Sequence, residues 1–172
     1  MSKLIHILLF IFMLICVPHT NASARNSEYQ SITAFCYHDV VTPDRRDILD
    51  KDVYAISTTR LEEHFKLYKK LGYTPISLKQ YDDYIEGRGE LPEMPILLSF
   101  DDGRDSMYHN IYPLLKKYNY PAVYAIILSY MEMLPADIEK MVTWDQLNEM
   151  AASGLVEVAS HSYDLHNYVV SN

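Results

Sequence analysis

The chain has 172 residues, a hydrophobic content of 49% and a charged content of 22%. These values are typical of a globular domain with its own core, and they exclude an intrinsically disordered or low-complexity chain. The formal net charge of −8 argues against nucleic acid or an anionic membrane surface as a partner, because both would repel an acidic protein.

The first two dozen residues have the pattern of a secretory signal peptide. Lys3 precedes an apolar run over residues 4–17, and Ala22-Ser23-Ala24 forms a small-residue cleavage site. Because the run is shorter than the ~20 residues that a spanning helix needs, an uncleaved membrane anchor is the alternative interpretation. We expect residues 1–24 to be removed on export to the periplasm or cell envelope, which leaves a mature chain of residues 25–172.

One cysteine, Cys36, remains in that mature chain. An internal disulfide is therefore excluded, and stability must come from the packed core. Cys36 ends an apolar stretch, residues 31–36, that predicts the first strand. We interpret it as a small buried residue.

Strand and helix patterns alternate along the rest of the chain. Short apolar runs predict buried strands, and capping sequences before apolar residues at helical spacing predict helices. Residues 42–52 are polar and predict a loop, and the stretch that contains Met131, Met133 and Met141 predicts a looser region. Strands are expected at residues 31–36, 73–76, 95–100, 121–128 and 155–160, and helices at 59–72, 77–87, 105–118 and 143–154, with capping boxes that begin at Thr59, Ser77 and Thr143.

This alternation indicates parallel strands joined by crossover helices. Both an open doubly wound sheet and a (β/α) barrel have this pattern. The sequence supplies about five strands, whereas a closed barrel of this kind needs about eight. We therefore expect an α/β fold, with an architecture that is cut short.

Two adjacent carboxylates end the central apolar run. Asp101 and Asp102 follow residues 95–100 and precede Gly103. Asp-Gly is a common turn dipeptide, so this stretch alone favours a turn. Neighbouring strand residues point to opposite faces, so both carboxylates can serve one site only where the strand ends and the chain turns. The carboxyl ends of parallel strands are also where α/β folds place their catalytic groups.

Polar groups follow two other predicted strands. Tyr37-His38-Asp39 follows the first strand, and His161 follows the last, with His166 five positions later. Such a spacing separates two histidines on either a helix or a strand, so they meet only if the chain curls back after His161. One carboxylate with two histidines can hold a divalent transition metal, and a second carboxylate can deprotonate water.

The other histidines of the mature chain carry weaker signals. His64 and His109 fall in predicted helices among polar neighbours, and we expect both to be solvated. For His38, ordinary packing and a position near the metal are equally compatible with the sequence.

Ser99–Gly103 and His161–His166 resemble the first two motifs of the polysaccharide deacetylase family, carbohydrate esterase family 4. With Tyr37-His38-Asp39, the resemblance spans residues 32–166 and implies an incomplete (β/α) barrel of that family's type. It implies that Asp101 is the catalytic base and that Asp102, His161 and His166 hold the metal. Zinc is the family default, and iron, cobalt or nickel would also suit these ligands. His38 and Asp39 are candidates for substrate binding.

The resemblance also implies an activity, the metal-dependent N-deacetylation of a poly-β-1,6-N-acetylglucosamine exopolysaccharide of biofilms. Components of an exopolysaccharide export system are then candidate partners. Later family motifs, which supply an arginine-containing wall, an aspartate that tunes the base and a histidine general acid, would lie beyond Asn172. Two alternatives stay open: a truncated, largely inactive fragment, and a glycan-binding or metal-binding module without turnover.

Overall fold

The computed structural model describes residues 30–133 and 140–164. Strands and helices alternate through most of these ranges, as predicted. The strands are β1 (Thr33–Tyr37), β2 (Asp39–Val41), β3 (Ala55–Ser57), β4 (Thr74–Pro75), β5 (Pro95–Asp102), β6 (Ala122–Ile127) and β7 (Val156–Ser162). The helices are α1 (Arg46–Leu49), α2 (Thr58–Leu71), α3 (Leu78–Ile85), α4 (Tyr112–Tyr118), α5 (Leu128–Met133) and α6 (Trp144–Ala152), and a π-helical turn, η1 (Met107–Ile111), precedes α4.

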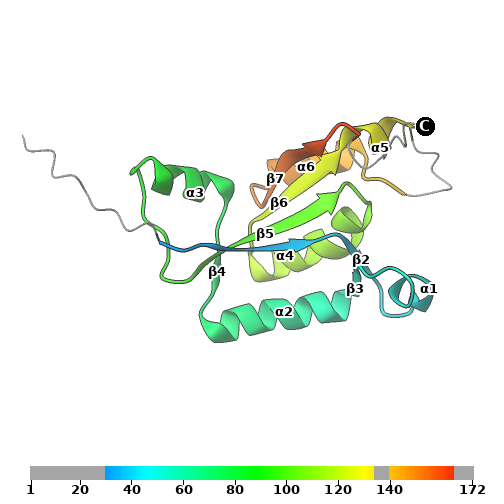
Figure 1. Cartoon of the computed structure of the whole chain (residues 1–172), viewed down its shortest axis with the longest axis horizontal. Helices are drawn as coiled ribbons and strands as arrows, with labels where there is room; N and C mark the ends of the chain where they lie inside the picture. The colour runs from blue at the N-terminus through cyan, green and yellow to red at the C-terminus, as the bar shows by residue number, and fades with distance from the viewer. Residues whose placement is uncertain (1–29, 134–139, 165–172) are drawn as a thin grey trace, which may run out of the picture. The chain divides into compact units, whose positions relative to one another are not determined.

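Five of these strands form one sheet in which every pairing is parallel. Its order is β1-β5-β6-β7, and the short β4 pairs with the first residues of β5. Strands β2 and β3 form a separate parallel pair. Figure 1 shows α2 and α4 along the same side of the sheet. The α/β fold with five parallel strands is confirmed. Within the described residues β7 does not pair with β1, so the sheet is an incomplete barrel.

The two faces of the sheet differ in what they carry. On β5 the buried residues Ile96, Leu98 and Phe100 alternate with the half-buried residues Leu97, Ser99 and Asp101. Side chains alternate in this way because successive residues of a strand point to opposite faces. Cys36 of β1 is the register partner of Ser99 and therefore lies on the same face as Asp101. The buried face forms the core, and the half-buried face is left to small and polar side chains.

Helix α2 covers the buried face with a stripe at helical spacing. Leu61, Phe65 and Tyr68 are the buried residues of this helix, and Gly72 ends it in the left-handed conformation with φ of 84°. The Phe65 ring lies edge-on to Tyr118 of α4, with ring centroids 5.6 Å apart. The apolar residues at helical spacing on α2 therefore form its buried face, and one of them, Phe65, contacts α4.

Three local predictions are wrong. Helix α2 begins at Thr58, one residue before the predicted capping residue Thr59, because β3 runs to Ser57, and the Ser57 hydroxyl accepts a hydrogen bond from the Arg60 amide. The short helix α1 lies in the polar stretch predicted as a loop. Helix α5 follows β6 directly, at the start of the stretch predicted to be loose. The capping boxes at Ser77 and Thr143 are confirmed.

No helix in the described part of the chain combines the length and the apolar character that crossing a membrane requires. The predicted signal peptide at residues 1–24 lies outside the described residues, and it stays a prediction.

Candidate active site

The polar groups singled out from the sequence lie at the carboxyl ends of the parallel strands. His38 follows β1, Asp101 and Asp102 are the last two residues of β5, and His161 is next to the last residue of β7. Because the strands are parallel, these ends meet at one edge of the sheet. The expected convergence is therefore observed, although the strands extend through the aspartates and His161 rather than ending before them.

Asp101 is oriented by hydrogen bonds from two neighbouring strands. The Ser99 hydroxyl donates to Asp101 Oδ1 at 2.6 Å, and the Cys36 thiol donates to Asp101 Oδ2 at 3.1 Å. Both donors follow from the register, since Ser99 lies two residues before Asp101 and pairs with Cys36. A carboxylate that accepts hydrogen bonds on both oxygens is held in one orientation, which a general base requires.

The interpretation of Cys36 as a buried core residue is wrong. Cys36 is exposed, because it lies on the half-buried face of β1, an edge strand of the sheet. Partial burial, the hydrogen bond to Asp101 and the nearby carboxylates raise the pKa of the thiol to about 12. The thiol therefore keeps its proton at neutral pH and donates it to the Asp101 carboxylate.

The chain turns at Asp102, and this turn directs its carboxylate away from that of Asp101. Asp102 has a left-handed backbone with φ of 77°, and Gly103 follows with φ of 95°. Asp102 Oδ1 lies 3.7 Å from Nε2 of His161, across β6. Asp101 thus faces Cys36 and His38, while Asp102 faces His161.

A β-bulge positions His161. Ser160 pairs with Ile126 and Ser162 pairs with Ile127, so His161 is the extra residue on β7. A bulge interrupts the alternation of side chains and can aim one of them at a site. Beyond it, the buried Ser129 donates a hydrogen bond from its hydroxyl to Asp164 Oδ1 at 3.1 Å.

That bond, and another from the Ser129 amide to the Tyr163 carbonyl at 2.9 Å, hold the start of the loop after β7. The expected ligand His166 lies outside the described residues. The contribution of Ser129 was not predicted, because the sequence predicts a loose region where α5 places it.

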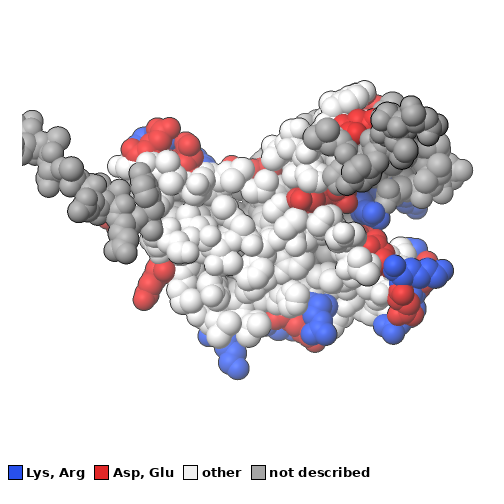
Figure 2. Space-filling model, in the orientation of Figure 1, with Lys and Arg blue, Asp and Glu red and all other residues white. Residues whose placement is uncertain are grey.

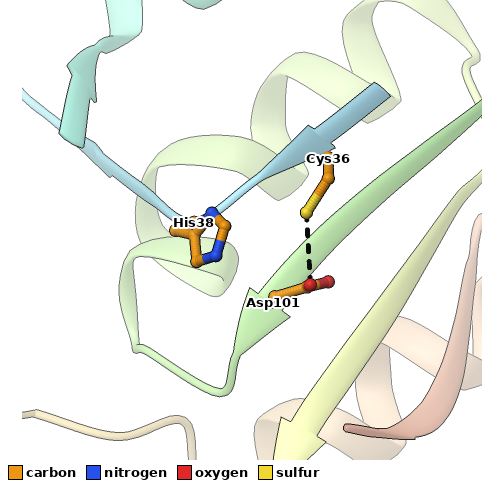
Figure 3. A group of neighbouring side chains, drawn as sticks. All are labelled: Cys36, His38 and Asp101. Atoms are coloured by element: carbon orange, nitrogen blue, oxygen red, sulfur yellow. Dashed lines mark hydrogen bonds between the residues drawn. The ribbon is translucent and has the colours of Figure 1, made fainter. Parts of the chain in front are cut away.

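His38 lies beside Asp101. A ring nitrogen of His38, a carboxylate oxygen of Asp101 and the Cys36 sulfur all lie within 4.8 Å of one another, and Figure 3 shows the three side chains pointing toward a common centre. The His38 ring also lies beside the ring of Tyr54, with ring centroids 5.0 Å apart. Of the two interpretations of His38, the structure favours the position at the site.

The two helical histidines differ from each other. His109 is exposed, as predicted. His64 is half-buried, and its Nδ1 lies 3.0 Å from the Tyr37 hydroxyl, so its prediction as a solvated side chain is wrong. Burial, with the nearby Arg60 guanidinium, lowers the pKa of His64. Its contacts belong to the packing of α2 against β1.

Asp39 has a structural contact as well as a place at the site edge. Its side chain is buried, and its Oδ2 lies 3.5 Å from a guanidinium nitrogen of Arg104. Both residues border a groove of about 480 Å³ that Asp105 and Lys140 also line. Burial raises the pKa of Asp105. Asp39 therefore shapes a groove beside the strand ends, while the ion pair occupies its carboxylate.

The donors at Asp102 and His161 fit a divalent metal ion. Tetrahedral bonds of about 2.1 Å from zinc to oxygen and nitrogen place two ligand atoms about 3.4 Å apart. The observed 3.7 Å between Asp102 Oδ1 and His161 Nε2 is close to this separation. A carboxylate and an imidazole are also the ligands that zinc, iron, cobalt and nickel accept.

Comparisons with known proteins agree with this geometry. Residues 88–171, which contain Asp101, Asp102 and His161, match the family model of polysaccharide deacetylases. Over 155 residues the chain is 32% identical to the poly-β-1,6-N-acetyl-D-glucosamine N-deacetylase of Escherichia coli K12, an alignment that covers 84% of this chain and 22% of that protein. The chain belongs to the polysaccharide deacetylase family.

A second curated relative and a solved structure are also similar to this chain. The poly-β-1,6-N-acetyl-D-glucosamine N-deacetylase of Staphylococcus aureus N315 is 32% identical over 119 residues, which are 69% of this chain and 41% of that protein. A solved structure of a de-N-acetylase from Aggregatibacter actinomycetemcomitans is 40% identical, with a TM-score of 0.72, over 82% of this chain and 58% of that one. The chain thus spans 22% to 41% of the length of these two curated relatives.

Proposed function

We propose that this polysaccharide deacetylase domain is a metal-dependent N-deacetylase that acts on poly-β-1,6-N-acetylglucosamine. One observation carries the proposal: an oriented carboxylate, Asp101, lies directly before a second carboxylate that faces His161 at the strand ends. The relatives named above, with that substrate in their names, support the choice of polymer. Figure 2 shows few charged side chains over the middle of the visible face, while charged side chains lie around its margin.

Asp102, His161 and His166 would hold the divalent ion in this proposal. When bound, such an ion supplies Lewis acidity that polarises the acetamide carbonyl. The donor set suits zinc, iron, cobalt or nickel. Orientation is the contribution of the chain: the turn at Asp102 and the bulge at His161 aim the two side chains at each other.

Asp101 is assigned the role of general base. Its carboxylate accepts a proton from the water whose oxygen attacks the acetamide carbon, while Ser99 and Cys36 keep the carboxylate in place. The carbon–nitrogen bond then breaks, which yields acetate and a free amine on the sugar. The amine must take up a proton as it leaves.

His38 is placed to deliver that proton. Its ring lies beside Asp101, just beyond the carboxyl end of β1, and histidine is a common general acid in catalysis. The family resemblance implies a histidine general acid beyond Asn172, so His38 and a downstream histidine are alternatives for this role. If a His38→Ala variant keeps an unchanged kcat, the general acid is not His38.

An amine assay tests the activity. The chain is loaded with zinc or cobalt and incubated with poly-β-1,6-N-acetylglucosamine oligomers, and free amines are measured alongside acetate. We expect Asp101→Asn to lower kcat by about 10² to 10⁴, the range for removal of a general base. Asp145→Asn, at an exposed aspartate in the first turn of α6, is the matched control. Glycan binding without acetate release, or equal rates for wild type and Asp101→Asn, would contradict the proposal.

We also propose that the chain is exported after cleavage of residues 1–24 and works with an exopolysaccharide export system. The basic start and apolar run of the sequence support this. Amino-terminal sequencing of the exported protein should find Arg25 as the first residue. An intact Met1 in the cytoplasmic fraction would contradict it.

A further inference from the structure

Three metal-binding side chains meet on the face of the sheet that Asp101 occupies. The Cys36 sulfur, a ring nitrogen of His38 and a carboxylate oxygen of Asp101 lie within 4.8 Å of one another. All three belong to the part of the chain that the structure describes, and Figure 3 shows Cys36 on β1, Asp101 on β5 and His38 on the segment that follows β1. None of the three belongs to the pair formed by Asp102 and His161.

The backbone register places these groups together. Cys36 and His38 are two residues apart along the chain, and Ser99, the register partner of Cys36, is two residues before Asp101. Residues at this spacing on an extended chain share one face. Cys36 and Asp101 are therefore supplied by two paired strands, and His38 is the first residue after β1.

We propose that Cys36, His38 and Asp101 form a second metal site, which binds zinc and related thiophilic divalent ions. A thiolate, an imidazole and a carboxylate are all zinc ligands, and three protein ligands leave a fourth position for water. The thiolate is a softer ligand than the carboxylate and imidazole of Asp102 and His161, so this site favours thiophilic ions more strongly than that pair does. Cys36 is exposed, which gives an ion a path to the sulfur.

Metal binding here replaces a proton. The thiol now donates its hydrogen to Asp101 Oδ2. On binding, the sulfur–hydrogen bond gives way to a sulfur–metal bond, and the proton passes to solvent. The carboxylate exchanges its hydrogen bond from the thiol for a bond to the ion, so the negative charges of both groups face the metal.

Occupancy of this second site has a consequence for turnover, and this consequence rests on the proposed function. An ion bound to Asp101 and His38 occupies the assigned base and its neighbouring imidazole. Excess zinc should then inhibit an enzyme whose first site is already loaded. Cys36 and His38 lie outside residues 88–171, the match to the family model, whereas Asp101 lies inside it.

Cobalt spectroscopy tests the binding without reference to activity. The full chain carries Cys16→Ser, which leaves Cys36 as its single thiol, and Asp102→Asn, which disables the first site. Titration with Co²⁺ should produce a near-ultraviolet thiolate-to-cobalt charge-transfer band that saturates at one equivalent, and zinc should displace it. Adding Cys36→Ser should abolish the band, and adding His38→Ala or Asp101→Asn should weaken cobalt binding at least about tenfold. His109→Ala, at an exposed histidine, should leave it unchanged.

Two outcomes would overturn the second site. The first is the absence of a band in a folded chain, with folding checked by circular dichroism. The second is an equally strong band in the His38→Ala and Asp101→Asn variants, which would mean that the thiol binds cobalt alone. In the turnover assay, the rate of each chain at excess zinc is divided by its own rate with only the first site loaded. Excess zinc should lower this ratio less in Cys36→Ser than in wild type. A chain with the band but no deacetylation would refute the proposed function and keep the second site.

Discussion

The left-handed backbone at Asp102 predicts that this residue lowers stability in the absence of metal. An L-residue in this region pays about 1–2 kcal/mol relative to right-handed backbone, and glycine does not. Asp102 has φ of 77°, and its side chain is only 14% exposed, so its carboxylate is also largely withdrawn from water. We therefore expect Asp102→Gly to stabilise the metal-free chain.

The expected gain is modest. Relief of about 1–2 kcal/mol of strain is offset by about 0.5–1 kcal/mol, because glycine loses more conformational freedom on folding. The net gain is about 1 kcal/mol, which corresponds to a rise in Tm of about 2–4 °C for a chain of this size. With Cys36→Ser in both chains to remove the proposed second site, and with zinc at about 100 times the Kd of the first site, the chain that keeps Asp102 should gain about 2.7 kcal/mol, and Asp102→Gly should lose most of that response.

Thermal and urea unfolding, with a chelator and with zinc, measure both effects. Asp102→Asn is the control for charge, since asparagine tolerates left-handed backbone. Gly103→Ala is the opposite control: its φ is 95°, its new Cβ would lie 3.2 Å from Met141 Cε, and it should destabilise the chain. An Asp102→Gly variant less stable than wild type in chelator, or one with the full zinc response, would refute the reasoning.

Three further predictions concern the groove and the core. Burial raises the pKa of Asp105 above its unfolded value, so the folded chain loses stability as pH rises from the unfolded pKa through the raised one. Asp105→Asn should therefore raise the urea midpoint at neutral pH and leave it unchanged below pH ~3, where the carboxyl group is protonated in both states. Asp39→Asn should lower the free energy of unfolding by about 2 kcal/mol, because it removes the carboxylate that lies 3.5 Å from the Arg104 guanidinium. A double-mutant cycle with Arg104→Gln should show positive coupling, and additive losses would contradict the prediction. Phe100→Ala, at a wholly buried ring, should cost about 3–5 kcal/mol in urea unfolding, while Leu67→Ala at an exposed position should change stability by less than about 0.5 kcal/mol.

Local signals in the sequence were sufficient for much of the fold. The capping boxes at Ser77 and Thr143 are formed by residues three positions apart, so they do not depend on the rest of the molecule. The start of α2 does depend on it, because β3, which pairs with β2, runs to Ser57, and Ser57 is the N-cap in place of the predicted Thr59. A local sequence pattern cannot predict a pairing between strands that are distant in the chain.

The site divides in the same way. The convergence of the groups at Asp101, Asp102 and His161 could be predicted, because all parallel strands bring their carboxyl ends to one edge. The exposure of Cys36 could not, since it depends on β1 being an edge strand and on which face the helices cover. A signal was present in the spacing of Ser99 and Asp101, which puts a hydroxyl and a carboxylate on one face of any strand.

The backbone turn decides how the two aspartates divide their roles. If β5 continued with ordinary strand backbone through Asp102, this residue would point to the buried face that Phe100 occupies. The left-handed conformation instead turns its carboxylate toward β7, where the bulge has displaced His161 to meet it. Two irregularities, one on each strand, are therefore needed to form this pair, whereas Asp101 reaches Cys36 and Ser99 by regular strand geometry alone. Strained backbone persists only where the surrounding structure holds it, and here it occurs at Asp102, one of the residues to which we assign the metal.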